Sequence, residues 1–170
     1  GIMPVDRDAL AKLEREGRIV FQQDAHREEH SIEVLIPLLM KRFGAIPIVP
    51  LLAGTAEDRE LARVLEAVME PGDLLVISSD LSHYLDDDEC RQKDALTLTA
   101  IVEGRGSDVG PYEACGHLGI GAVGLLAAAR GWMPMVLGYS NSGESGGDLK
   151  RVVGYGAIVY VSGQGSAATA

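Results

Sequence analysis

The sequence is short of positive charge. Only 15 of its 170 residues are Lys or Arg, against 25 Asp or Glu, and the formal net charge is −10. Proteins bind nucleic acids through basic surfaces that neutralise the phosphates. We therefore expect no nucleic-acid partner.

Cysteine is scarce, and long apolar runs are missing. Two cysteines, Cys90 and Cys115, are too few for a disulfide framework, so we expect a reducing, cytoplasmic location. The apolar run over 46–53 is far shorter than the ~20 residues that span a bilayer. No charged-then-apolar leader opens the chain, and we expect no membrane association. Because the first residue is Gly1 rather than Met, we expect the natural start to lie upstream.

Helical and strand patterns alternate along the chain. Apolar residues at helical spacing predict helices over 6–16, 31–43, 56–69, 87–103 and 117–130, and apolar runs predict strands over 18–22, 46–52, 74–78, 135–139 and 152–161. This alternation predicts an α/β fold with a layered sheet. We expect one domain over residues 1–162, followed by a flexible Gly/Ala/Ser-rich tail over 163–170.

Two short motifs resemble sites that their context does not support. The glycines at 119, 121 and 124 match a dinucleotide-binding pattern, but no strand pattern precedes them, so close helix packing is the better interpretation. Residues 138–142 resemble a nucleophile elbow, but Ser142 replaces the required second glycine.

The segment 26–30 fits the His-x-x-Glu-His pattern of some zinc proteases. On one helix, His26 and His30 would share a face and hold zinc, with Glu29 as base. The amphipathic pattern begins only near Ser31, however. We expect His26 to be exposed and not to share a metal with His30.

Asp80 and His83 follow the apolar run 74–78. Ligands of open α/β sheets gather beyond the carboxyl ends of strands. A carboxylate three residues from an imidazole suits an acid/base pair or a metal site. The alternative is a helix cap at Asp80 and a surface histidine. Cys115 opens a helical pattern, where a thiolate is favoured and can bind a transition metal; a buried, inert cysteine is the alternative.

Four segments together resemble the Memo family in order and spacing. They are 29–34 with Pro37, 78–84, Cys115-Gly116 with Ile120, and 139–143 with 152–155. The resemblance covers nearly the whole chain and implies that residues 1–162 are the C-terminal part of one Memo-like domain. It also implies a layered, mostly parallel or mixed sheet with helices on both faces, as in the class III extradiol dioxygenases.

The resemblance also implies a metal pocket. Its ligands would be Cys115 and two histidines upstream of Gly1, so we expect iron or copper in the full-length protein and weak or no binding here. His83 matches the acid/base histidine of the dioxygenases, accompanied by Asp80, and His30 is expected to line the pocket. His117 would sit at its rim. We predict that Asp80, His83 and Cys115 converge on one cleft.

The resemblance implies an altered non-haem iron or copper pocket with a metal-dependent redox role. Prokaryotic relatives are called AmmeMemoRadiSam system protein B, which implies radical-SAM and AMMECR-domain partners; the ligand would be a small molecule or a peptide. The alternatives are a non-catalytic peptide-interaction module and a zinc hydrolase that uses His26, Glu29 and His30. If residues are missing upstream, apolar surface should be exposed around 46–52 or 74–77.

Overall fold

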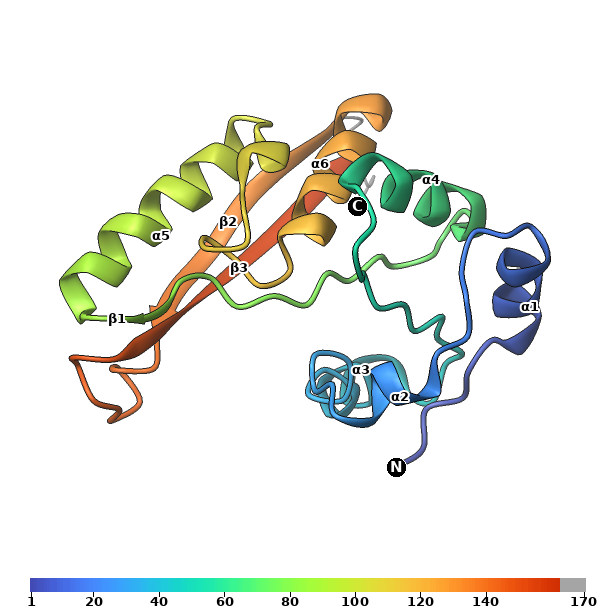
Figure 1. The fold of residues 1–170 in the computed structure, drawn as a ribbon, viewed down its shortest axis with the longest axis horizontal. Helices are drawn as coiled ribbons and strands as arrows, with labels where there is room; N and C mark the ends of the chain where they lie inside the picture. Colours follow the sequence, from blue (N-terminus) through green and yellow to red (C-terminus); the bar gives the residue numbers. More distant parts are fainter. Residues whose placement is uncertain (163–170) are drawn as a thin grey trace, which may run out of the picture.

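The computed structural model describes residues 1–162, which form six α-helices, one 3-10 helix and three strands (Figure 1). The helices are α1 (Arg7–Arg15), α2 (Gln23–Arg27), α3 (Ile36–Phe43), α4 (Asp58–Val68), α5 (Asp87–Val102), η1 (Gly106–Asp108) and α6 (His117–Arg130). The strands are β1 (His83–Leu85), β2 (Trp132–Asn141) and β3 (Val152–Ser162). The expected tail over 163–170 lies outside the described residues.

The sheet is antiparallel, in the order β1-β3-β2. Strands β2 and β3 form a long hairpin that pairs Trp132 with Ser162 at one end and Asn141 with Gly154 at the other. The register shifts in β2 between Val136 and Gly138. The short β1 pairs with the other edge of β3, opposite Val152 and Val153.

Helices α5 and α6 pack on the same face of this sheet. Their apolar side chains share one core with the inward residues of the strands; its members include Leu98, Ile101, Ile120, Val136, Tyr139 and Ile158. The opposite face carries Met133, Met135 and Leu137 of β2, all exposed. The general α/β class is confirmed. The expected parallel or mixed sheet with helices on both faces is not what the described residues form, since their sheet is antiparallel and covered on one face.

The segments 46–52 and 74–78 explain this difference. Both run extended, but the first makes only an isolated parallel bridge between Val5 and Ile48, and the second belongs to no strand. An extended segment becomes a strand only when a neighbour satisfies its backbone hydrogen bonds. Leu74 is 61% exposed, and Ile46 and Val76 are exposed as well. The predicted apolar exposure is confirmed, although these segments offer no paired strand.

The predicted helices are largely confirmed, with shifted starts. Asp6 caps α1, accepting a hydrogen bond from the Ala9 amide at 2.9 Å. Helix α3 begins at Ile36 with Pro37 in its first turn, after a turn over 31–35. Helix α4 is capped at Glu57 and begins at Asp58, two residues later than predicted. The strand expected over 18–22 is wrong, because these residues are irregular and mostly exposed.

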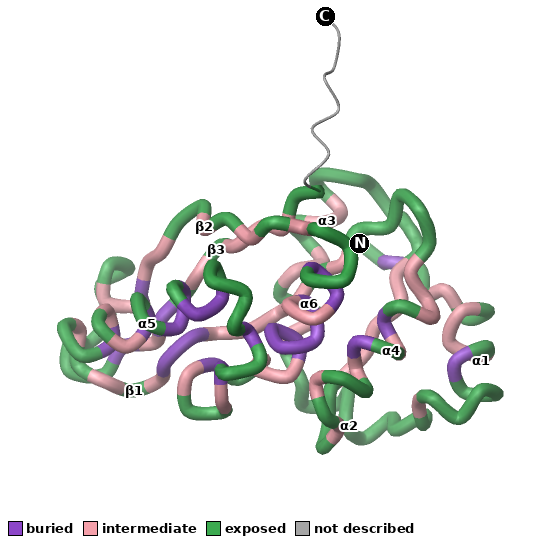
Figure 2. Tube along the Cα trace, turned by 90° about the horizontal axis from the view of Figure 1, so that it is seen from above, coloured by how far each residue is buried: buried purple, intermediate pink, exposed green. Residues whose placement is uncertain are grey.

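A second core joins α4 to α6 through Ala62, Leu65, Ala122 and Leu126. Helices α2 and α3 contain no buried residue and lie apart from the sheet (Figures 1 and 2). Within residues 1–162, no helix has both the length and the apolar character needed to cross a membrane.

Candidate functional site

Asp80, His83 and Cys115 come together beside the start of β1. Their predicted convergence is confirmed, whereas the predicted cleft around them stays a prediction. A carboxylate oxygen, an imidazole nitrogen and the thiol sulfur all lie within 4.8 Å of one another. The His83 Nε2 to Asp80 Oδ2 distance is 3.5 Å. Asp80 and His83 are partly exposed and Cys115 is exposed, so the cluster faces solvent.

Reciprocal hydrogen bonds hold the two parts of this cluster together across 35 residues of sequence. The Asp80 amide donates to Cys115 Sγ at 3.1 Å, and the Cys115 amide donates to the Asp80 carbonyl at 3.3 Å. One position on, the Gly116 amide donates to Ser79 Oγ at 2.8 Å. These bonds fix the sulfur beside the Asp80 backbone.

Gly116 is required by this close approach. It is the N-cap of α6, and a Cβ there would lie 2.6 Å from Ser79 Cβ and 2.8 Å from the Ser78 carbonyl oxygen. His83 is placed from the other direction, since it pairs with Val153 in the sheet. Tyr84, the next residue, has a left-handed φ of 60°, a rare conformation for a residue with a side chain. Tyr84 lies at the register shift between His83 and Leu85 in β1.

The donor set fits a transition-metal ion. A thiolate is a soft ligand, an imidazole binds iron, copper and zinc, and a carboxylate adds a hard oxygen. Three protein ligands at a solvent-facing position leave room for a further ligand, and catalytic metal sites keep such an open coordination position. The Asp80 amide donates to the sulfur and so holds it at the position where an ion would bind.

The other histidines do not join this cluster. His26 is exposed on α2, which ends at Arg27, and His30 lies beyond that helix end. The His30 side chain is 73% exposed, and its Nδ1 lies 2.6 Å from a Glu33 carboxylate oxygen. The two imidazoles therefore share no helical face, so the one-helix arrangement that the zinc-protease interpretation requires is not formed. The expected position of His30 at the pocket stays a prediction.

His117 lines a neighbouring hollow. This hollow has a volume of about 300 Å³ and lies between the starts of α4 and α6, lined by Glu57, Asp58, Ser107 and His117 among others. Its lining does not include Cys115, so His117 faces a space other than the Asp80–His83–Cys115 cluster. Nδ1 of His117 is buried without a hydrogen-bond partner among residues 1–162.

The dinucleotide-like glycines of 119–124 and the elbow-like segment 138–142 both lie in regular secondary structure. Gly119 and Gly121 lie inside α6, where added Cβ atoms would lie 2.8 Å from Ile77 and 2.9 Å from Asp58. These glycines serve close packing rather than phosphate binding. Ser140 lies within β2 and donates to Glu144 at 2.8 Å, so no strand-turn-helix presents it as a nucleophile.

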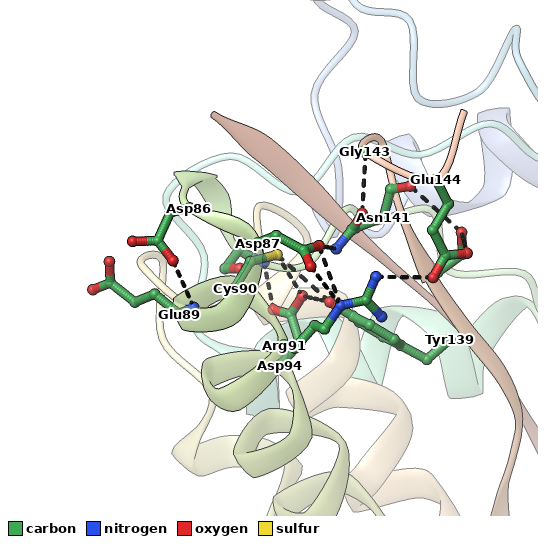
Figure 3. A network of polar contacts seen from close by, with 12 residues as sticks. Asp86, Asp87, Glu89, Cys90, Arg91, Asp94, Tyr139, Asn141, Gly143 and Glu144 are labelled. Carbon is green, nitrogen blue, oxygen red and sulfur yellow. Dashed lines mark hydrogen bonds and ion pairs between the residues drawn. The ribbon is translucent and has the colours of Figure 1, made fainter. Parts of the chain in front are cut away.

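The structure contains a buried set of hydrogen-bonded side chains centred on Asp94, which the sequence did not predict. The Asp94 carboxylate, 0% exposed, accepts hydrogen bonds from the Ser82 amide at 2.9 Å, Tyr139 OH at 2.8 Å and Cys90 Sγ at 3.2 Å (Figure 3). Burial raises the pKa of both the Cys90 thiol and the Tyr139 hydroxyl, so both keep their protons. Cys90 and Asp94 are four residues apart on α5 and share one helix face, but the sequence does not show that this face is buried.

A second polar group ties α5 to the hairpin loop. Arg91 bonds to Asp87 and Glu144, and the buried Asn141 donates to Asp87 at 2.6 Å (Figure 3). The Arg91 guanidinium, with Asn141, lowers the pKa of Asp87. The acidic start of α5 thus combines a helix cap at Asp86 with this ion-pair group.

The chain is similar to one protein family over nearly its whole length. The family described as Memo-like protein matches residues 1–159. A MEMO1 family protein of Archaeoglobus fulgidus is 34% identical over 151 residues, which are 80% of this chain and 56% of that protein. One of Thermoplasma acidophilum is 33% identical over 168 residues, 92% of this chain and 62% of its own length. One of Methanosarcina acetivorans is 36% identical over 154 residues, 79% and 55% of the two lengths. The chain thus spans about three-fifths of the relatives that it matches.

Proposed function

Because this chain belongs to the Memo-like protein family, we propose that it contributes Cys115, His83 and Asp80 to a metal pocket with a redox role. The observation that carries the proposal is the convergence of three different donor atoms within 4.8 Å. Nothing in the local fold requires a thiol, an imidazole and a carboxylate at one solvent-facing point. A shared ligand accounts for all three.

The three side chains have separable tasks in this proposal. Cys115 supplies the thiolate that anchors the ion, held in place by the Asp80 amide. His83 binds beside it or holds a proton at the pocket, and the Asp80 carboxylate, 3.5 Å away, orients the ring. An iron or copper ion would supply one-electron redox chemistry when bound. The rest of this chain's contribution is to position these groups.

The longer relatives suggest how the pocket is completed. They extend well beyond the matched region, and the exposed apolar segments 46–52 and 74–78 are suited to pairing with further strands. We propose that the complete domain has the layered sheet of class III extradiol dioxygenases and two further metal histidines. This chain alone would then bind iron or copper weakly.

Anaerobic titration with Co²⁺ tests the site, because a thiolate ligand gives a charge-transfer absorption band. We expect wild-type protein to show that band, Cys115→Ser to lose it, and His83→Gln to bind about 10-fold more weakly. His26→Gln is the matched control, since His26 is an exposed histidine outside the cluster. Equal binding by wild type, Cys115→Ser and His83→Gln would rule out this site.

A second candidate function is a peptide-interaction module. The observation that favours it is the exposed apolar face of β2, formed by Met133, Met135 and Leu137. Radical-SAM or AMMECR-domain proteins are the partners that the family resemblance suggests. A pull-down comparing wild type with Leu137→Lys and with Cys115→Ser separates the two functions. Loss of a partner only in Leu137→Lys favours the module, and loss only in Cys115→Ser favours the metal pocket.

A further inference from the structure

The Asp94 carboxylate lies in the centre of α5, fully buried, and its partners come from α5 itself and from two other parts of the chain. Ser82 belongs to the segment that carries Asp80 and His83, Tyr139 belongs to β2, and Cys90 lies one turn earlier on α5. Within residues 1–162 no ion pair includes Asp94. A buried carboxylate without a cation is costly unless hydrogen bonds compensate for the lost water.

All three partners can only donate to Asp94. The Ser82 amide is a fixed donor, and the Cys90 thiol and Tyr139 hydroxyl keep their protons because burial raises the pKa of each. The Ser82 hydroxyl continues the chain by donating to Cys90 Sγ at 3.3 Å. Ser82 is therefore held at both its amide and its side chain.

The backbone around Asp94 is built to admit it. A Cβ at Gly154 would overlap Asp94 Oδ2, so only glycine leaves the carboxylate its place against β3. Gly154 also forms two backbone hydrogen bonds to the segment that carries Asp80 and His83. The Leu81 amide donates to the Gly154 carbonyl at 2.8 Å, and the Gly154 amide donates to the Ser82 carbonyl at 2.9 Å. Asp94 and Gly154 thus both form hydrogen bonds to the backbone between Asp80 and His83.

We propose that Asp94 is a positioning residue for the Asp80–His83–Cys115 cluster, acting through the Ser82 amide. The inference rests on the proposed metal pocket for its purpose, but it concerns the placement of His83 in the protein itself. Asp94 bonds to the amide of Ser82, which directly precedes His83 in the chain. A carboxylate that only stabilised the core would not require a partner at this position. Replacing the carboxylate by an amide removes one hydrogen-bond acceptor, which should let the segment that carries Ser82 shift and displace the His83 imidazole.

The test compares Asp94→Asn with Asp87→Asn. Both replace a hydrogen-bonded carboxylate on α5 by the amide of equal size, but the partners of Asp87 are Arg91 and Asn141, which lead to the hairpin loop rather than to His83. The first measurement is the position of the His83 ring signals in ¹H–¹³C NMR spectra of the metal-free proteins, assigned with His83→Gln. The second is Co²⁺ affinity and the thiolate charge-transfer band.

We expect Asp94→Asn to shift the His83 ring signals and to weaken Co²⁺ binding about 10-fold, as outer-shell changes do at metal sites. Asp87→Asn should leave both unchanged. Unchanged His83 signals in folded Asp94→Asn, or an equal change in Asp87→Asn, would overturn the inference.

If Asp94→Asn does not fold, Tyr139→Phe carries the test, because it removes one donor to Asp94 and no backbone contact. The expected change has the same direction and a smaller size, and its absence would overturn the inference. If wild-type protein binds no Co²⁺, the proposed metal pocket fails, while the metal-free NMR comparison still decides the role of Asp94.

Discussion

At the scale of single residues, the two cysteines show how burial and hydrogen bonding separate one side-chain type into two chemistries. Cys115 is exposed and accepts a hydrogen bond from a backbone amide. Cys90 is fully buried, and its sulfur contacts Ser82, Asp94 and Tyr139. Burial raises the pKa of the Cys90 thiol, so it stays protonated and unreactive at neutral pH.

Alkylation should therefore distinguish the two thiols. With iodoacetamide at neutral pH, we expect Cys90 in the folded protein to react about 100-fold more slowly than Cys115, because it must wait for the core to open. Peptide mapping of a time course measures both rates, and both should react readily in urea. Comparable rates in the folded protein would contradict the buried placement of Cys90.

Gly154 gives a prediction on stability. Gly154→Ala should lower the free energy of unfolding by about 1–3 kcal/mol, because its methyl group overlaps the Asp94 carboxylate and forces the core to shift. Gly138→Ala is the matched control in the neighbouring strand, since nothing lies within 4 Å of a Cβ there. Urea unfolding measures both, and a loss in Gly138→Ala as large as that in Gly154→Ala would count against this account.

At the scale of elements, helices were predicted well and strands poorly, for a physical reason. A helix satisfies its own backbone, so local signals such as the Asp6 cap of α1 and the left-handed Gly131 at the end of α6 suffice. A strand depends on neighbours that the local sequence does not name. The run 74–78 has the composition of a buried strand, yet it has no strand partner within residues 1–162.

The same distinction applies to the candidate site. Asp80, His83 and Cys115 could be predicted because two follow an apolar run and one precedes a helix, and such positions are where ligands bind. Asp94 could not. It follows the acidic residues at the start of α5, and its sequence context is the same as that of a solvent-facing carboxylate. Only the packing of α5 on β2 and β3 distinguishes them.

Helix α6 gives a prediction at this scale. Gly124→Ala should raise the free energy of unfolding by about 0.5–1 kcal/mol, because alanine favours helix and the nearest atom to its Cβ would be 3.7 Å away. Gly119→Ala should lower it, since Ile77 Cγ2 lies 2.8 Å from the new methyl group. Thermal unfolding of the two variants measures the difference, and equal effects would mean that α6 does not pack as described.

At the scale of the whole molecule, the distribution of apolar surface is unusual. One sheet face is covered by α5 and α6, while Met133 at 61% exposure, Met135 and Leu137 lie open on the other face. Figure 2 shows that most residues in and around α1, α2 and α3 are exposed as well. Apolar surface of this extent normally marks a partner surface or favours aggregation.

We expect this chain to self-associate through the open sheet face. Met135→Lys with Leu137→Lys should lower the fraction of oligomer in sedimentation velocity at the same concentration, because charge on an exposed strand opposes association. Leu96→Lys is the matched control, since Leu96 is exposed on α5 instead. An equal decrease in the control would show that added charge, rather than the sheet face, is responsible.

The register shift in β2 changes which face of the sheet the odd-numbered side chains occupy. Before the shift, odd-numbered Met133 and Met135 point outward; Leu137 is the unpaired extra residue at the shift; after it, odd-numbered Tyr139 and Asn141 point inward. Side chains alternate along a strand, so only the extra residue allows this exchange. Deleting one residue at the shift would turn the phenol and the amide out to water, away from Asp94 and Asp87. Substitutions in β2 should therefore be tolerated more readily than insertions or deletions. The number of residues before the shift determines which face of the sheet each half of the strand presents to the core.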